Sequence, residues 1–413
     1  MLPPLPHDPL VMLAASVDAL SNHIGLLLVV GAGVGFYAAA RAVVDALGGA
    51  EPSAGVLAAA HGVPIALVAA VAALMGLPEV AVAVAFASSV AVLSLVLGLV
   101  ALNDVGPRDQ PPPTSARAWP FLVPAALLAF VAGFSGRLTP LHALLLAVQG
   151  VAIAAVWRGE RSAVAPPHDV LIDPATDPMT GAEPPPLAER APVRRLDGFR
   201  LAELGFAVVL GLLGAWAAVN GAVRMSHEQA IMTPTLVGAS VVAPLLVLPM
   251  VGAGTLLARL GRARAATTAI VAIVLLNVCA VLPLVVALSV ARPAFASALG
   301  PLAAVLDPPA PPPPPVYVAD DESAVEATTI PAVETTTAPT TQPAPDEPVR
   351  HWTDGVPYPM AVWRLDTVVL IVLCLVILPV ALGRWTLGRR DGLVLVIVYA
   401  VYLALTALFG RRW

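Results

Sequence analysis

The sequence has few charged residues and no lysine. Only 12% of its 413 residues are charged, and all 22 basic residues are arginine. A typical soluble domain has about 25% charged residues. With 58% hydrophobic residues and a mean hydropathy of +0.86, the composition is typical of a chain that meets lipid. The net charge of −5 comes largely from loops, so no nucleic-acid partner is expected.

Cysteine is also scarce. The chain has two cysteines, Cys279 and Cys374, and both lie inside apolar runs. A pair of this kind supports neither a disulfide framework nor a cysteine-ligated metal site. The sequence also shows no nucleophile–base pair, no phosphate-binding loop and no cluster of metal ligands. We therefore expect no enzyme activity and no cofactor.

Long apolar runs dominate what is present. A helix needs about 20 apolar residues to cross a bilayer, and by that measure the sequence predicts ten spans. They cover approximately residues 24–47, 54–75, 79–101, 118–135, 139–157, 201–223, 234–257, 265–291, 365–383 and 392–409. Two polar segments stand outside them, 158–199 and 293–364. The second is rich in proline and threonine with scattered acids, which cannot bury a core, so we expect it to be disordered.

The arginines predict the orientation. Cytoplasmic loops carry an excess of basic residues, and most arginines share one side if the N-terminus lies outside. This places segment 158–199 in the cytoplasm and segment 293–364 outside it. We expect a multi-pass protein of the plasma (inner) membrane, whose surroundings are the lipid bilayer. The sequence names no protein partner for either polar segment.

An internal repeat is visible at a displacement of 185 residues. It aligns Pro64 with Pro249 and Gly76 with Gly261, without a gap to residue 97. The first repeat is then 1–157, and the second comprises 200–292 and 365–413. Five spans in each half is an odd number, so the halves must run in opposite directions. Inverted repeats with interrupted helices are the architecture of secondary transporters.

The motifs around these prolines carry a family resemblance. "HGVPI" precedes "GLPEVAVAVAFASSVAV", and "MTPTLVGASVVAPLLVLPM" precedes "LGRARAATTAIVAIVLLN". In this arrangement the chain resembles the cation/calcium exchanger superfamily, the sodium/calcium exchanger membrane region, over nearly all ten spans. The resemblance implies an all-α polytopic membrane protein with ten transmembrane helices in two inverted five-helix repeats. Helices 2 and 7 are expected to be interrupted, at Gly62 and Pro64 and at Pro249.

The resemblance also implies where an ion would bind and what the site has lost. Members of this superfamily use one glutamate from each repeat, directly after the motif proline, and these positions are Ile65 and Met250 here. A site without carboxylates argues against Ca²⁺, which binds six to eight oxygens with negative charge among them. The candidate ion-binding residues that remain are His61, Ser88, Ser89 and Asn277.

Each candidate has two interpretations. His61 is an ionisable group within a span, which favours a functional role, or a neutral group bonded to the backbone that a helix break frees. Asn277 needs a partner, either an ion or a facing helix. Ser88 and Ser89 bind an ion or bond back to their own helix.

Three functions remain open. The first is a secondary cation transporter (an antiporter) of altered specificity, for Na⁺, H⁺ or another cation. The second is a transport-inactive relative that acts as a membrane scaffold through its polar segments. The third is a calcium exchanger that uses ligands of another kind.

Overall fold

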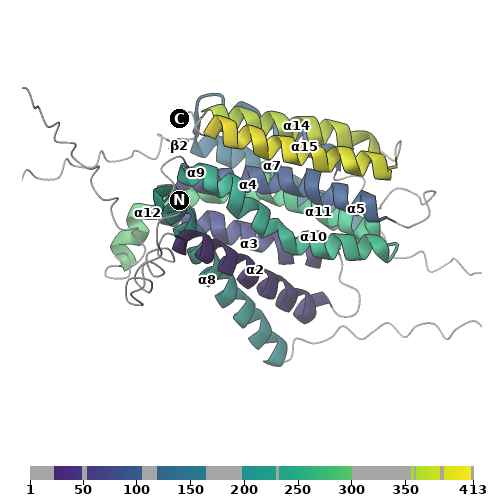
Figure 1. Ribbon diagram of the computed structural model, residues 1–413, viewed down its shortest axis with the longest axis horizontal. Helices are drawn as coiled ribbons and strands as arrows, with labels where there is room; N and C mark the ends of the chain where they lie inside the picture. The colour runs from purple at the N-terminus through teal and green to yellow at the C-terminus, as the bar shows by residue number, and fades with distance from the viewer. Residues whose placement is uncertain are drawn as a thin grey trace, which may run out of the picture.

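The fold is a bundle of membrane-length helices (Figure 1). The computed structural model describes residues 23–48, 54–104, 119–163, 198–228, 232–299, 355–357, 360–381 and 386–410. Within them, eight helices are long and apolar enough to cross a membrane, and two shorter apolar helices cover Leu122–Ala132 and Pro140–Val156. The ten predicted spans each coincide with one of these ten helical segments.

The helical segments contain several short irregular turns. The first half comprises α2 (Ile24–Gly48), α3 (Ala54–Leu74), α4 (Pro78–Ala91), the π-helical turn η1 (Val92–Val96), α5 (Leu97–Asn103), the 3₁₀ turn η3 (Trp119–Phe121), α6 (Leu122–Ala132) and α7 (Pro140–Ala163). The second comprises α8 (Gly198–Glu228), α9 (Pro234–Val237), the π-helical turn η5 (Gly238–Val242), α10 (Ala243–Arg259), α11 (Ala263–Leu276), the π-helical turn η6 (Asn277–Val281), α12 (Leu282–Leu299), α14 (Met360–Ala381) and α15 (Arg389–Gly410). Two-residue strands β1 (Arg137–Leu138) and β2 (Val356–Pro357) pair antiparallel.

The most deeply buried helix is α4. Of the apolar window in Pro78–Asn103, 94% is buried, against 28% in α2 and in α15. Helix α4 lies in the middle of the bundle, with α14 and α15 on one side and α2 and α8 on the other (Figure 1). It carries no charge after Glu79 and is built of alanine, valine and serine. An all-round apolar helix of small residues is suited to a core position where neighbouring backbones come close.

The 185-residue repeat has a backbone counterpart. Gly76 and Gly261 both adopt positive φ, 81° and 73°, in the turns before α4 and α11. These two helices begin at residues 78 and 263, and the turns η1 and η6 begin at residues 92 and 277. All three pairs are separated by the predicted displacement, so the two halves share their irregular backbone features as well as their apolar pattern.

The predicted interruptions of helices 2 and 7 are not breaks. Helix α3 continues through Gly62 and Pro64, and Pro249 lies inside α10. A proline removes one backbone donor, but neighbouring helices hold such a helix together inside a membrane bundle. The departure from regular α-helix lies instead in η1, η5 and η6.

The ordered helices reach into both predicted polar segments. Helix α7 ends at Ala163 and α12 at Leu299, while β2 begins at Val356 and α14 at Met360. These helices therefore extend a few residues past the predicted span limits at 157, 291 and 365. Residues 164–197 and 300–354 lie outside the described residues, and the prediction of disorder falls on the second of these ranges.

Two hydrogen bonds join helix ends that the predicted orientation places on the same side of the membrane. Arg292 donates from Nε to the carbonyl of Leu74 (3.1 Å), and Arg200 donates to the carbonyl of Ala46 (3.4 Å). Such bonds satisfy carbonyls at a helix C-terminus. Each contact joins two helix ends that the predicted alternation of spans places on the same side.

Glycines allow α2 and α8 to approach closely. A Cβ on Gly221 would lie 2.7 Å from the carbonyl oxygen of Gly25, and a Cβ on Gly25 would lie 2.6 Å from the backbone nitrogen of Met225. Small residues at a membrane helix interface let backbones pack against each other. This pair of helices is the most extensively packed in the described structure.

We expect Gly221→Ala to lower the thermal stability of the detergent-solubilised protein. Overpacking costs about 1–3 kcal/mol, and the obstacle here is backbone, which cannot rotate away. Gly205→Ala is the matched control, since it lies on the same helix with nothing within 4 Å of the added Cβ. Equal melting temperatures for the two variants would contradict the close approach of α2 and α8.

Candidate functional site

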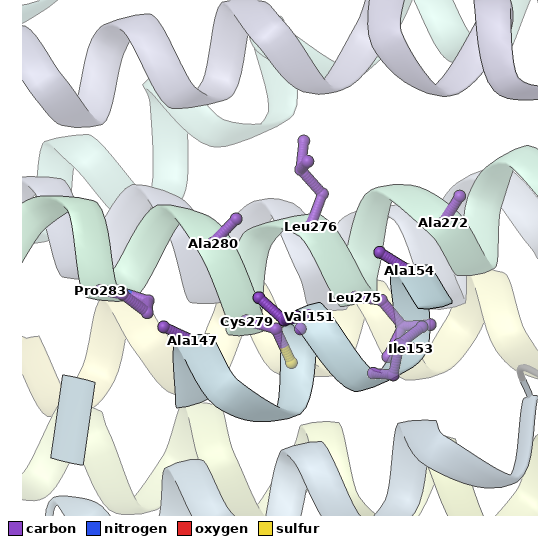
Figure 2. Close-up of a pocket in the computed structure, with 11 residues that line it drawn as sticks. Ala147, Val151, Ile153, Ala154, Ala272, Leu275, Leu276, Cys279, Ala280 and Pro283 are labelled. Carbon is purple, nitrogen blue, oxygen red and sulfur yellow. The ribbon is translucent and has the colours of Figure 1, made fainter. Parts of the chain in front are cut away.

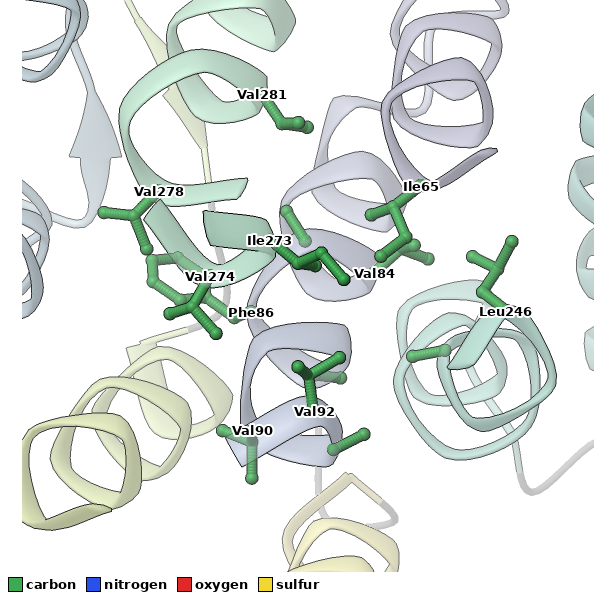
Figure 3. Packing of buried hydrophobic residues seen from close by; sticks show 14 of the residues in the cluster. Ile65, Val84, Phe86, Val90, Val92, Leu246, Ile273, Val274, Val278 and Val281 are labelled. Carbon is green, nitrogen blue, oxygen red and sulfur yellow. The ribbon is translucent and has the colours of Figure 1, made fainter. Parts of the chain in front are cut away.

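The centre of the bundle is apolar at the two positions where the exchanger resemblance implies glutamates. Ile65 is 1% exposed and Met250 is fully buried. Both belong to one continuous buried cluster. Figure 3 shows Ile65, Ile273 and Leu246 directed toward one region from three different helices. The positions that the resemblance assigns to ion ligands thus fill the core with hydrocarbon.

Polar candidates lie one helical turn from these apolar side chains. Residues four apart share a helix face, so His61 lies on the face of Ile65 and Asn277 continues the face of Ile273. On α4, Ser88 lies between Val84 and the first residue of η1. The centre therefore alternates between hydrocarbon and a few neutral polar groups.

One hydrogen bond joins the two halves at this level. The side-chain amide of Asn277 donates from Nδ2 to Oγ of Ser89 (3.2 Å), and both residues are fully buried. The Ser89 hydroxyl in turn donates to the carbonyl of Ala85 (2.8 Å). Of the two interpretations of Asn277, the structure shows the facing-helix contact. For Ser89 it shows the bond back to its own helix.

Three polar side chains at this level, Asn277 among them, have atoms without a hydrogen bond. Within the described part of the chain, no partner is found for either ring nitrogen of His61, for Oγ of Ser88 or for Oδ1 of Asn277. All three residues are buried, with His61 only 5% exposed. Ser88 therefore does not bond back to its helix, and His61 does not cap backbone freed by a break. Buried polar atoms without partners are rare and point to a water, an ion or a functional role.

Gly62 brings α3 onto the helix that carries Asn277. A Cβ at Gly62 would lie 2.6 Å from Cδ2 of Leu276, the residue before Asn277. Helix α3 contacts η6 directly as well. The glycine next to His61 therefore serves close helix packing, a role that the prediction of a helix break did not include.

The donor set limits what this centre can hold. Among the described residues, no group of three or more His, Cys, Asp or Glu side chains is placed to bind a metal ion. The available atoms are neutral: a hydroxyl oxygen, an amide oxygen and imidazole nitrogens. Such a set suits a proton or a weakly bound monovalent cation better than a divalent one.

A separate pocket lies between α7 and the α11–η6–α12 segment. It has a volume of about 410 Å³. Figure 2 shows Ala147, Val151, Leu275 and Cys279 among its lining residues. None of the predicted site residues lines it. With Cys279 as its most polar side chain, the pocket is a hydrocarbon surface.

Helix α14 carries a buried carboxylate outside the repeat motifs. Asp366 is fully buried, and Oδ1 accepts a hydrogen bond from the hydroxyl of Tyr402 in α15 (2.9 Å). The signal was present in "WRLDTVVLIVLCLVILPV", an acid within an apolar run, which marks a functional candidate. The repeat motifs are centred on Pro64 and Pro249 and do not include this position.

Comparison with known proteins places the chain by its fold. No family model and no curated protein matches the sequence. Among solved structures, the H⁺/Ca²⁺ exchanger CAX superposes with a TM-score of 0.56 at 13% identity, covering 97% of this chain and 91% of that chain. The sodium-calcium exchanger NCX_Mj, soaked with Na⁺ and without Ca²⁺, gives 0.49 at 14% identity, covering 94% and 97%. The likeness to CAX confirms the cation/calcium exchanger fold that the resemblance predicted.

Proposed function

We propose that this chain is a secondary cation transporter whose central site takes a monovalent cation, Na⁺ or H⁺, in place of Ca²⁺. The observation that carries the proposal is the set of unpartnered buried polar groups, His61, Ser88 and Asn277, around a hydrogen bond that links the two repeats. We also propose the plasma (inner) membrane as its location, from the distribution of arginines.

The chemistry of these groups favours an ion with a single positive charge over a divalent one. An imidazole takes up a proton near neutral pH when its environment allows, and hydroxyl and amide oxygens are ligands of hard cations. Ca²⁺ would need several more oxygens and compensating negative charge. Ile65 and Met250 occupy the positions where that charge would be.

A flux measurement tests the proposal. Purified protein in proteoliposomes is given gradients of Na⁺, H⁺, K⁺ and Ca²⁺ in turn. We expect Na⁺ or H⁺ flux and no Ca²⁺ flux. Asn277→Val, which installs the residue of the equivalent position in the first repeat, and His61→Ala should each reduce that flux by about tenfold or more, the equivalent of at least ~1.4 kcal/mol.

Matched controls separate the site from general damage. Asn220→Val changes a half-buried asparagine on α8 that bonds to its own helix. Ser94→Ala, the control for Ser88→Ala, removes a buried hydroxyl that already donates to the carbonyl of Val90. Both controls should keep the wild-type flux. Equal losses in controls and site variants would contradict a role for the central polar groups.

The apolar centre favours a second candidate, a transport-inactive scaffold with an exchanger fold. The buried apolar cluster contains Ile65, Met250 and Ile273. Their hydrocarbon side chains leave no oxygen ligands at these central positions. Absence of flux for every ion from well-folded protein would support this alternative. The scaffold would then act through protein partners of the two polar segments, 158–199 and 293–364.

A further inference from the structure

A second buried polar group lies away from the central site, between α14 and α15. Asp366 and Thr406 are fully buried, and Tyr402 is 1% exposed. The Tyr402 hydroxyl donates to Oδ1 of Asp366 across the two helices (2.9 Å). We propose that Asp366 and Tyr402 form a reversible proton-binding site. This goes beyond the proposed function, because it uses neither the central residues nor their transport.

The neighbouring hydroxyls bond to the backbone of their own helices. Thr367 donates to the carbonyl of Trp363 (2.7 Å), and Thr406 donates to the carbonyl of Tyr402 (2.9 Å). The Thr406 side chain also lies within hydrogen-bond reach of the Tyr402 phenol. A side-chain hydrogen bond from Tyr402 to Asp366 links α14 and α15 at this level.

The geometry accommodates both charge states of Asp366. When the carboxyl is ionised, the Tyr402 hydroxyl donates to Oδ1. When it is protonated, the carbonyl oxygen remains an acceptor, and the same bond persists. Proton uptake forms one O–H bond and removes one negative charge, with no other group changed. An ionisable group inside a membrane bundle is costly and is kept where it has a function.

Tyr399 adds a second phenol beside the pair. Its ring stacks on that of Tyr402, with centroids 6.2 Å apart and an interplanar angle of 28°. Its hydroxyl is buried and has no hydrogen-bond partner among the described residues. Residues three apart share a helix face, so this free hydroxyl lies on the α15 face that carries Tyr402.

Other titratable groups on the packed elements are few. Helix α15 carries Arg389, Arg390 and Asp391, all exposed in its first turn, eight or more residues before Tyr399. Helix α14 carries exposed Arg364 and buried Cys374. Helix α4 carries Glu79, about 10 Å along the helix from Phe86, while α5, α6, α9, η1, η3 and η5 carry none.

The helix that carries Asp366 packs against the central helix α4. Trp363, one turn before Asp366, packs against Phe86 of α4 with ring centroids 5.6 Å apart. Phe86 lies two residues before Ser88. A change of charge at Asp366 therefore occurs on a helix that is in direct contact with the helix of the central polar groups.

Infrared spectroscopy of the full chain in lipid measures the proton directly. We expect a carbonyl band of a protonated carboxyl that appears on acidification and is absent from Asp366→Asn. Tyr402→Phe should keep the band and move it to higher frequency, because the carbonyl loses its hydrogen bond. Asp391→Asn, an exposed acid whose carboxylate accepts from the Gly388 amide, should retain the wild-type band.

Two results would overturn the proposal. One is a spectrum of Asp366→Asn that matches the wild type at every pH at which both are folded, combined with a carbonyl band of Tyr402→Phe at the wild-type frequency. The other is abolition of the band by saturating Na⁺ or K⁺ at fixed pH, because a metal ion would then hold the carboxylate ionised. The band should persist in His61→Ala and Asn277→Val, so failure of the central proposal leaves this one standing.

Discussion

Ile65→Glu is expected to destabilise the protein by about 3–5 kcal/mol, the cost of an uncompensated buried charge. The substitution restores the carboxylate that the exchanger resemblance assigns to this position, but its surroundings are hydrocarbon. Ile65 is 1% exposed within the continuous apolar cluster. The nearest polar groups are few and carry no charge, so the carboxylate can be neutralised only by a proton on itself or on His61, and either protonation has its own cost. Thermal unfolding of the detergent-solubilised protein measures the loss.

Two further substitutions separate charge from shape. Ile65→Leu conserves volume and should cost less than about 1.5 kcal/mol. Ile65→Gln has the shape of the glutamate without its charge, so it should fall between the two. A melting temperature for Ile65→Glu within error of the wild type would show that water reaches position 65, and the apolar centre would be wrong.

Gly133→Ala is also expected to destabilise the protein, at the contact between α6 and α14. A Cβ at Gly133 would lie 1.7–1.9 Å from three atoms of the Trp363 ring. The indole is 1% exposed and packs against Phe86 on another side, so it has no free space into which to move. The backbone at Gly133 has φ −94°, which alanine tolerates. The loss, at or above the usual ~1–3 kcal/mol of overpacking, therefore reports the clash alone.

A double variant and a control make this test specific. Gly133→Ala combined with Trp363→Leu should cost less than the sum of the single changes, because the second removes the ring that the first strikes. Gly252→Ala, with nothing within 4 Å of the added Cβ, should keep or raise the melting temperature, because alanine is the better helix former. Additive costs in the double variant would contradict the contact between Gly133 and Trp363.

The fold was largely predictable because membrane spans are local features. The length of each apolar run predicts a helix, and all ten predicted runs are helical. Glycine in a turn is similarly local, since positive φ at Gly76 and Gly261 is open to glycine without steric cost. The 185-residue displacement could be found because it aligns such features in both halves.

The sequence indicated candidate residues for the site but not their contacts. The sequence indicated that the carboxylate positions hold Ile65 and Met250, and that Asn277 needs a partner. It could not show that the partner is Ser89, 188 residues away. It also left Ser88 and His61 open, because a missing hydrogen bond depends on every neighbour at once.

The sequence by itself determined a multi-pass helical membrane protein with two repeats, because lipid requires each span to be apolar and to satisfy its backbone internally. Only the tertiary structure decided that Pro64 and Pro249 sit inside continuous helices, since packing from adjacent helices outweighs one missing donor. It also brought Asp366 to Tyr402, 36 residues apart. Contacts of this kind depend on how helices pack, and helix packing is set by glycines and side-chain shapes distributed over the whole chain.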